Sequence, residues 1–371
     1  MAEISEKTTK ENNVKKTNPV LKVIGRVFAF IGVTLLMAVI FLYFVMNVCV
    51  NGPSRRVKEL FVLSVRESSA GGFLADIFLT KEEIQAIEDA NKVEDIDELT
   101  DLSIVSVNLA QEKTEETVTD ENGEETVSYI CESSYDSNIY VENGIEFHEL
   151  KGPTFTGTMA VVADPSRVFV GTPRDYYDGS AGLSVPAIAD RYGAILAING
   201  AFFVDEGGVG NGGTPIGFVF SQGKQLYGGS GTTYNMMGFT NDGILMCGRM
   251  TGAQAESYGI RDGLTCNVFL VINGEKVNVS GTGGGLNPRT ALGQRADGAV
   301  LLLVLDGRQA TSLGATLSDV ADVMVSFGAV NAGNLDGGGS SVIYYNGEIM
   351  NVVMSIYGAR GVPDAVCVMP E

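Results

Sequence analysis

One carboxylate is followed by three glycines and two hydroxyl residues in the stretch "NAGNLDGGGSS", residues 331–341. Consecutive glycines disfavour regular helix or strand, because glycine loses more backbone entropy on ordering than any other residue. Without side chains, their backbone N–H groups are unobstructed, and successive N–H groups in a turn form a concave nest for an anion. A plain tight turn is the structural alternative. The candidate site comprises Asp336, Gly337, Gly338, Gly339, Ser340 and Ser341.

Two arginines and a second carboxylate lie beside other apolar segments. Arg289 and Thr290, both candidate contacts to substrate, stand in "LNPRTALGQ", and the apolar run "AVLLLVLDGRQ" ends in Asp306 and Arg308. A guanidinium group can bind a phosphate through two parallel hydrogen bonds, which lysine does not match. A carboxylate, two arginines and a glycine nest therefore suit a substrate that carries both a sugar and a phosphate. A local β-turn at Asp306 and a structural ion pair at Arg289 are the alternatives.

A further polar pair follows the apolar run 194–198 in "AILAINGAFF". Asn199 and Gly200 stand where a rigid strand would pass into a loop, which is a favourable place for binding residues. Asn199 and Gly200 are accordingly candidate contacts to substrate, although Asn199 could instead form a turn with Gly200.

Several kinds of chemistry are excluded or disfavoured by what the sequence contains. There is one histidine, His148, outside the glycine-rich region, and there is no G-x-S-x-G motif, so histidine-based nucleophilic catalysis is not expected. The five cysteines lack zinc-site spacing, and unpaired buried thiols are favoured over a Cys247–Cys266 disulfide. No cofactor is expected. A divalent cation stays open in case Asp306 and Asp336 converge.

The elements that must position these residues begin near residue 157 as short apolar segments separated by glycines. Segments 158–164, 167–172, 194–198, 216–220, 267–272, 299–305 and 341–345 are predicted strands. Two helices are predicted, 184–193 after a Ser184 cap, and 316–328, where Thr316 and Asp319 form an acidic variant of the capping box. Many strands and few helices predict an α+β domain with mixed β-sheets.

The N-terminal part predicts a single membrane span. Residues 27–50 carry no charge and exceed the ~20 residues that cross a bilayer. They are longer than a signal peptide's apolar core and lack small residues at a cleavage site, which favours an uncleaved signal anchor in contact with lipid. The basic residues mildly favour a cytoplasmic tail, 1–26, and an extracytoplasmic remainder, giving a single-pass protein of the cell membrane.

The segment between anchor and domain, residues 51–150, predicts juxtamembrane helices and an acidic hairpin around Asn122-Gly123. Residues 81–150 hold 21 Asp and Glu against 3 Lys and Arg, while the whole chain has a net charge of -20. The excess of negative charge argues against nucleic acid as a partner. A solvated acidic face is favoured over cation binding, since no spaced calcium-loop pattern appears.

The motifs "NGAFF", "RTALG", "DGR", "GATLSDVA" and "NAGNLDGGGSS" follow one another in the order typical of the phosphodiester glycosidases, and the chain resembles that family over residues 157–370. Ala201 replaces the second glycine of the family's usual "NGGFF". The family includes the lysosomal uncovering enzyme, which removes N-acetylglucosamine from a phosphodiester, and many bacterial surface proteins. The resemblance implies a catalytic domain over 151–371.

The resemblance also implies cleavage between an anomeric sugar carbon and its phosphate oxygen, in an α-linked sugar-1-phosphodiester of a surface polysaccharide or glycolipid. Asp336 is the first candidate for the carboxylate that acts at that carbon, and Asp306 the second. The arginines and the glycine nest would stabilise the departing phosphate. Two alternatives stay open: a glycan-binding or envelope-assembly protein without turnover, and an ordinary glycosidase whose substrate lacks phosphate.

Overall fold

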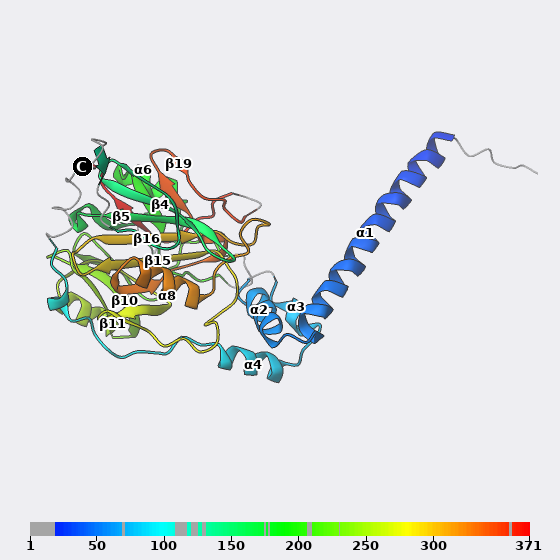
Figure 1. Ribbon diagram of the computed structural model, residues 1–371, viewed down its shortest axis with the longest axis horizontal. Helices are drawn as coiled ribbons and strands as arrows, with labels where there is room; N and C mark the ends of the chain where they lie inside the picture. Colours follow the sequence, from blue (N-terminus) through cyan, green and yellow to red (C-terminus); the bar gives the residue numbers. More distant parts are fainter. Residues whose placement is uncertain are drawn as a thin grey trace, which may run out of the picture. The chain divides into compact units, whose positions relative to one another are not determined.

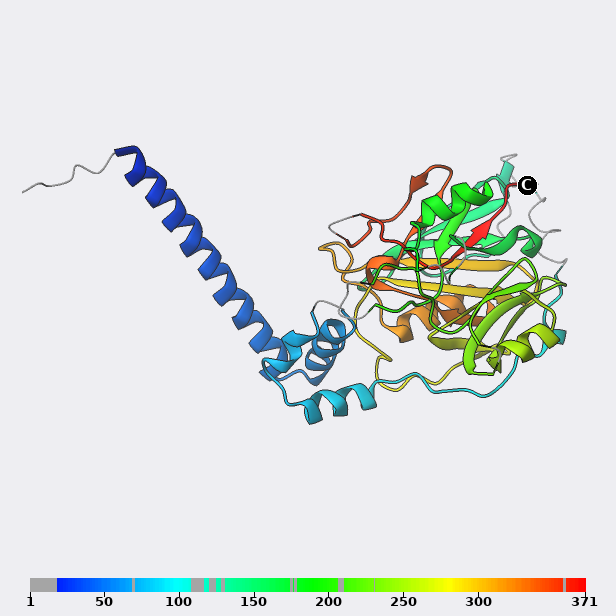
Figure 2. The same cartoon turned by 180° about the vertical axis from the view of Figure 1, so that it is seen from behind.

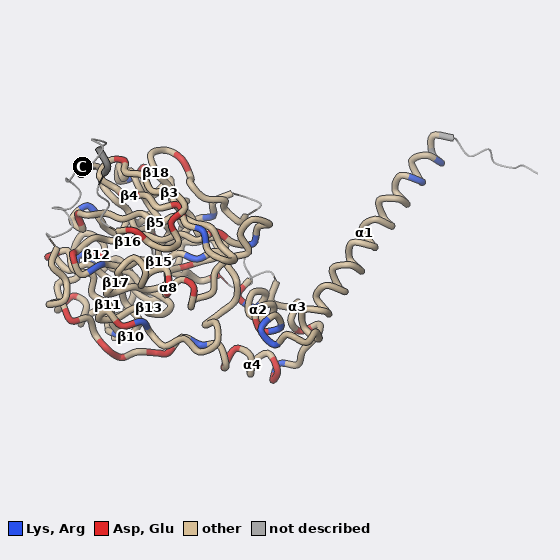
Figure 3. The backbone as a smooth tube through the Cα atoms, in the orientation of Figure 1, with Lys and Arg blue, Asp and Glu red and all other residues tan. Residues whose placement is uncertain are grey.

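The computed structural model describes residues 19–68, 71–107, 117–119, 125–127, 131–173, 176, 179–205, 210–229, 231–355 and 358–371. The chain divides into two compact units, Met1–Arg55 and Arg56–Glu371. The first contains helix α1 (Pro19–Asn51), whose segment Lys22–Asn51 is long and apolar enough to cross a membrane by length and composition. Figure 3 shows that charged residues on α1 are confined to its N-terminal part.

The second unit is built around three sheets, visible from both sides in Figures 1 and 2. The largest has eight strands, whose order from edge to edge is β14 (Glu275–Lys276), β13 (Val268–Ile272), β17 (Ala329–Asn334), β15 (Arg289–Arg295), β16 (Val300–Leu305), β5 (Thr156–Val162), β4 (Ile145–Lys151) and β3 (Asp136–Glu142). The sheet therefore includes strands that precede the predicted domain start at residue 151.

Two five-stranded sheets complete the set. One runs β11 (Leu245–Thr251), β10 (Thr233–Thr240), β12 (Ile260–Thr265), β8 (Val219–Ser221) and β9 (Lys224–Tyr227). The other runs β19 (Glu348–Ile349), β18 (Ile343–Tyr345), β7 (Leu196–Asn199), β20 (Ala365–Val368) and β6 (Val168–Gly171). The described strand pairs of these two sheets are antiparallel.

Strand β16 shows how the core is divided. Leu301, Leu303 and Leu305 belong to the apolar cluster around helix α8 (Leu317–Ser326), whereas Leu302 and Val304 belong to the cluster shared with the other sheets. Successive side chains of a strand point to opposite faces, so a strand buried on both faces is a continuous apolar run. This explains the unbroken sequence "VLLLVL".

The predicted helix boundaries are confirmed by their caps. Ser184 accepts a hydrogen bond from the Ala187 N–H group at the start of α6 (Val185–Tyr192), and Gly193 ends that helix with φ 69°. Thr316 and Asp319 form the reciprocal capping box of α8. Helix α7 (Gly252–Ser257), which was not among the predictions, has its own capping box.

The segment before the sheets contains the predicted juxtamembrane helices as α2 (Arg55–Arg66) and α4 (Lys81–Ala90), with the short α3 (Phe73–Asp76) between them. The predicted hairpin is present as β1 (Thr117–Thr119) paired antiparallel with β2 (Glu125–Val127); its Asn-Gly turn lies outside the described residues. Three single-turn 3-10 helices are described: η1 (Leu102–Ile104), η2 (Pro165–Arg167) and η5 (Gly338–Ser340).

The predicted α+β class is confirmed, with few helices against many strands. The favoured state of the thiols is also confirmed, since all five cysteines are free and Cys247 and Cys266 are not bridged. His148 is buried within β4, with its Nδ1 atom 3.2 Å from Asp136 Oδ1.

Candidate active site

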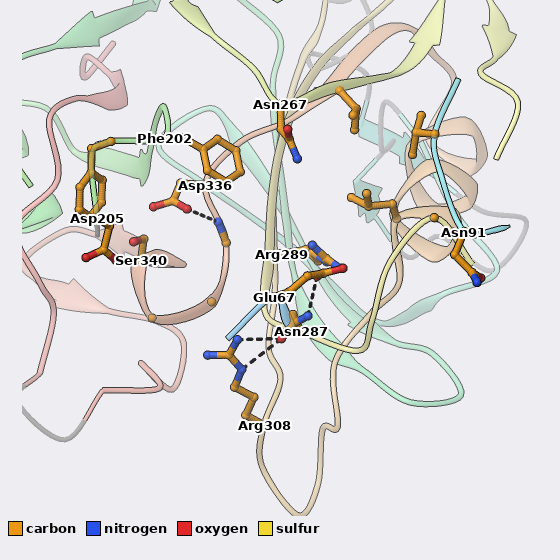
Figure 4. Close-up of a pocket in the computed structure, with 18 of the residues that line it drawn as sticks. Glu67, Asn91, Phe202, Asp205, Asn267, Asn287, Arg289, Arg308, Asp336 and Ser340 are labelled. Carbon is orange, nitrogen blue, oxygen red and sulfur yellow. Dashed lines mark hydrogen bonds and ion pairs between the residues drawn. The ribbon is translucent and has the colours of Figure 1, made fainter. Parts of the chain in front are cut away.

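The antiparallel pairing of three central strands brings the predicted site residues to one edge of the large sheet. Strands β16 and β17 both run antiparallel to β15, with Arg289 opposite Leu305 and Ala291 opposite Asn334. The end of each outer strand therefore lies beside the beginning of β15. A pocket of about 660 Å³ opens there (Figure 4). Its lining includes Asp336, Gly337, Gly338, Gly339, Ser340, Arg289 and Arg308.

The backbone of Asp336 is held by hydrogen bonds to residues at the end of β7, in the five-stranded sheet that contains β18 and β20. Asn199 Nδ2 donates to the Asp336 carbonyl at 2.6 Å, and the Asp336 N–H group donates to the Gly200 carbonyl at 3.1 Å. Thr290 Oγ1 donates to Asn199 Oδ1 at 2.8 Å and lies 3.2 Å from Ser341 Oγ. Four of the predicted site residues do not line the pocket but lie behind its wall: Asn199, Gly200, Thr290 and Ser341. From there their hydrogen bonds hold the backbone of Asp336 in place.

The carboxyl group of Asp336 faces the pocket beside the ring of Phe202 (Figure 4). Burial raises its pKa to about 6, although Ser340, the charge of Arg360 and the Gly337 N–H group oppose this by favouring the ionised form. The Gly337 N–H group donates to Asp336 Oδ1 at 2.9 Å. A carboxylate with a pKa near 6 is ionised at neutral pH and remains a stronger base than an ordinary aspartate.

The glycine loop uses several of its own N–H groups. Gly338 donates to the Pro288 carbonyl at 2.9 Å, and Ser340 donates to the Gly337 carbonyl at 3.1 Å. Gly338 has φ 61°, in the left-handed region that favours glycine, and a Cβ at Gly337 would lie 2.7 Å from Pro288 O. The glycines therefore serve at least in part to let the loop pack closely against Pro288.

The two arginines reach the pocket differently. Arg308, with φ 57°, donates through Nη2 and Nε to Asn287 Oδ1 at 2.7 and 3.2 Å (Figure 4). The buried Arg289 donates to the carbonyls of Gly285 and Ala315 and forms an ion pair with Glu67 at 2.7 Å. Burial and the neighbouring Arg289 charge lower the pKa of Arg308.

Glu67 follows helix α2 and reaches the pocket from outside the family-like region. Its Oε2 atom also accepts from Asn287 Nδ2 at 2.7 Å, and its Oε1 atom accepts from the Gly285 N–H group at 2.8 Å. One carboxylate therefore receives hydrogen bonds from a guanidinium, an amide and a backbone N–H group. Sequence reasoning did not identify Glu67, because only the fold brings it to Arg289.

The second candidate carboxylate, Asp306, does not line this pocket. Its side chain contacts Thr156, Asn351 and the Val352 backbone, and burial raises its pKa. The structure thus does not gather Asp306 and Asp336 around one pocket. Among the residues that the structure describes, no group of three or more His, Cys, Asp or Glu is placed to hold a metal ion.

Sequence reasoning also missed Arg360, which lines the pocket from the loop before β20. Its guanidinium lies 4.6 Å from the centre of the Phe203 ring and forms an ion pair with Asp205 at 2.9 Å. Phe202, Phe203 and Asp205 also line the pocket. The antiparallel pairing of β20 with β7 brings Arg360 to the NGAFF loop across more than 150 residues of chain, so no local pattern could reveal it.

A second buried carboxyl lies behind the same loop. Asp364 Oδ1 accepts from the Ala201 N–H group at 2.6 Å, and its carbonyl accepts from the Gly200 N–H group at 3.1 Å. A Cβ at Gly200 would lie 1.9 Å from Asp364 Oδ1, which accounts for glycine at that position. Burial, and then the charge of Asp336, raise the pKa of Asp364 to about 7, against the effect of the Ala201 hydrogen bond.

The sequence of the chain is similar to that of several known proteins. Residues 192–369 match the family described as phosphodiester glycosidase. A Bos taurus N-acetylglucosamine-1-phosphodiester alpha-N-acetylglucosaminidase is 29% identical over 185 residues, covering 45% of this chain and 34% of that protein. The Mus musculus protein of the same name is 26% identical over 220 residues, covering 54% and 41%. An SPbeta prophage-derived uncharacterised protein YomE of Bacillus subtilis is 43% identical over 65 residues, covering 18% and 10%.

The chain therefore spans well under half the length of these curated relatives. Among solved structures, the catalytic domain of the zebrafish N-acetylglucosamine-1-phosphodiester alpha-N-acetylglucosaminidase, auto-inhibited by its pro-peptide, matches with a TM-score of 0.52 and 22% identity. The match covers 63% of this chain and 83% of that one. At this identity it supports the fold, and together with the sequence match it confirms the resemblance predicted from the motifs.

Proposed function

We propose that this chain, whose residues 192–369 match the phosphodiester glycosidases, hydrolyses the sugar–phosphate bond of α-linked sugar-1-phosphodiesters. N-acetylglucosamine or a similar sugar would be the glycone, in a surface polysaccharide or a glycolipid. The observation that carries the proposal is the pocket that contains the Asp336 carboxyl, with its pKa of about 6, together with Arg289, Arg308 and Arg360.

The proposed reaction breaks the bond between the anomeric carbon and the phosphate oxygen. The oxygen of water bonds to that carbon, and the electron pair of the broken bond leaves with the phosphate monoester. Asp336 takes part either by removing the proton from water or by forming a glycosyl intermediate that water then resolves. A phosphate monoester departs as an anion without strong general-acid help, so stabilisation of its charge by arginine is the larger requirement.

The location of the reaction is also proposed. Residues 27–50 would cross the membrane as a signal anchor, with residues 1–26 in the cytoplasm and the catalytic domain outside. Support comes from the length and apolarity of the segment Lys22–Asn51. The substrate would then be a glycan or glycolipid of the cell surface.

The proposed hydrolysis is tested by replacing Asp336, which lines the pocket, and Asp306, which does not. Full-length chain in detergent is incubated with a panel of α-sugar-1-phosphodiesters, N-acetylglucosamine included, and released reducing sugar is measured. Asp336→Asn should lower turnover by about 10³-fold, because the group that acts at the anomeric carbon is lost. Asp306→Asn, which changes a carboxyl outside the pocket, should retain activity; both variants are checked by thermal unfolding.

A glycan-binding or envelope-assembly protein is the second candidate, and the Glu67–Arg289 ion pair favours it. An arginine whose charge is already compensated has less attraction for a phosphate. Folded full-length chain that binds the panel compounds but releases no sugar from any of them would support this candidate over the hydrolase.

A further inference from the structure

A second cavity of about 340 Å³ adjoins the pocket that contains Asp336. Three residues, Asp95, Phe202 and Asn267, line both cavities, so the two share a wall. The second cavity lies against the sheet of β10, β11 and β12 and is also lined by Ile216, Thr233, Tyr234, Asn235, Arg249, Thr265 and Cys266.

The lining of the second cavity combines apolar faces with amide groups. The Tyr234 ring packs against Phe218 with 5.7 Å between centroids and an interplanar angle of 82°, which fixes its orientation. Ile216 is 43% exposed. Asn235 Nδ2 donates to the Asn267 carbonyl at 3.0 Å, which links β10 to the residue that precedes β13 at the cavity wall. Flat aromatic and aliphatic faces beside amides match a pyranose ring, which has apolar faces and hydroxyls at its rim.

The charged residues of this cavity do not form an anion site. Arg249 forms an ion pair at 3.7 Å with Asp97, which lies outside the lining, and Asp95 is the acidic residue in the lining. The arginines of the first pocket, Arg289, Arg308 and Arg360, do not line the second cavity. A neutral ligand therefore suits it better than a second phosphate.

The positions of the lining residues indicate how a sugar-1-phosphodiester would be oriented across the two cavities. Figure 4 shows Phe202 beside Asp336, with Asn267 to the right of Phe202 and Arg308 lower in the view, beside Asn287. A phosphate placed at Arg308 and an anomeric carbon placed at Asp336 would leave the sugar pointing toward Phe202 and Asn267. The second cavity continues from those two residues.

We propose that the second cavity binds a sugar residue glycosidically attached to the sugar that bears the phosphodiester, so that the preferred substrate has at least a disaccharide as its glycone. This inference rests on the proposed function. Phe202 would contact the first sugar on one side and the second sugar on the other, and Tyr234 would pack against the ring of the second sugar.

The test uses two substrates with the same phosphodiester, one with a monosaccharide glycone and one with a disaccharide glycone. Wild-type full-length chain should prefer the disaccharide by about tenfold in kcat/KM, chiefly through a lower KM. Tyr234→Ala should lose this preference while cleaving the monosaccharide substrate as wild type does. Ile216→Gln, on the same cavity, should reduce the preference, and Tyr258→Ala, an exposed tyrosine outside both cavities, should leave it unchanged.

Equal kcat/KM for the two substrates in wild type, or an undiminished preference in folded Tyr234→Ala and Ile216→Gln, would overturn the inference. If neither substrate is cleaved, the proposed hydrolase function fails, and binding decides the inference separately. Saturation-transfer NMR with the disaccharide substrate on wild type should then show contact with both sugars, and Tyr234→Ala should lose the contact to the outer one. Contact with the inner sugar alone would contradict the inference.

Discussion

The ionisation of Asp336 links the residue scale to a measurable pH profile. Its pKa of about 6 lies above the ordinary value because burial penalises the charged form. Since the ionised carboxylate is the form that acts as base or nucleophile, kcat/KM should fall about tenfold per pH unit below pH 6 and level off above it. A profile for the proposed hydrolysis between pH 4.5 and 7 measures this. A plateau that continues down to pH 4.5 would show that Asp336 titrates at an ordinary value or takes no part.

Asp364 should be visible in the pH dependence of stability. Its pKa is raised from 3.8 to about 7 in the folded chain, so the folded state binds a proton that the unfolded state releases between these values. Stability from this group is therefore fully present below about pH 4 and is lost as the pH rises through 7. Asp364→Asn, which keeps an oxygen for the Ala201 N–H group, should unfold a few degrees above wild type at pH 8 and show no such gain at pH 4. Equal midpoints at pH 8 would refute the raised pKa.

At the residue scale, the sequence predicts site residues that stand in a short local motif, and it does not predict those that reach the pocket from distant segments. The sequence indicates Asp336 and its glycines because a run of glycines after a carboxylate is unusual in itself. Arg360 and Glu67 reach the same pocket from distant segments, and nothing in "ARGVPDAV" or "VRESS" marks them. The role of Asn199 in holding the Asp336 carbonyl likewise depends on two sheets meeting.

At the scale of elements, helix α2 delivers Glu67 to the arginine expected to bind phosphate. Glu67→Gln keeps the side chain's shape but removes the charge that compensates Arg289, whose side chain is 9% exposed. We expect the affinity for inorganic phosphate to rise about tenfold and the unfolding midpoint to fall by a few degrees, because a buried charge loses its partner. Isothermal titration with phosphate and thermal unfolding with and without phosphate measure both effects.

The matched control is Glu83→Gln, which changes a carboxylate on α4 that caps its own helix and lies outside the pocket. It should leave the affinity for phosphate unchanged. Unchanged phosphate affinity in Glu67→Gln as well would mean that Arg289 serves the fold and not the ligand.

The elements themselves were largely predictable, because periodicity, caps and apolar runs are local signals. The capping boxes and the run "VLLLVL" identified α8 and β16 without knowledge of their neighbours. The order of strands is not local, and it decided which residues reach the pocket. Asp306 and Arg308 follow the same strand, but only Arg308, whose backbone turns through a left-handed φ of 57°, lines the pocket.

At the scale of the whole molecule, the apolar segment Lys22–Asn51 should determine where the protein resides. Full-length chain expressed in bacteria should remain in the membrane pellet after alkaline carbonate extraction, whereas a chain that lacks residues 19–51 should appear in the soluble fraction. Protease added outside intact spheroplasts should digest the domain, as expected for an extracytoplasmic position. Protection of the domain until the membrane is permeabilised would place it on the cytoplasmic side.

The most direct measurement of the central claim asks which bond is broken. Hydrolysis of an α-N-acetylglucosamine-1-phosphodiester by full-length chain is run in water enriched in oxygen-18, and both products are analysed by mass spectrometry. Attack at the anomeric carbon predicts that the label enters the released sugar and that the phosphate monoester stays unlabelled. Label in the phosphate monoester would show attack at phosphorus and would contradict the assignment of Asp336 to the anomeric carbon.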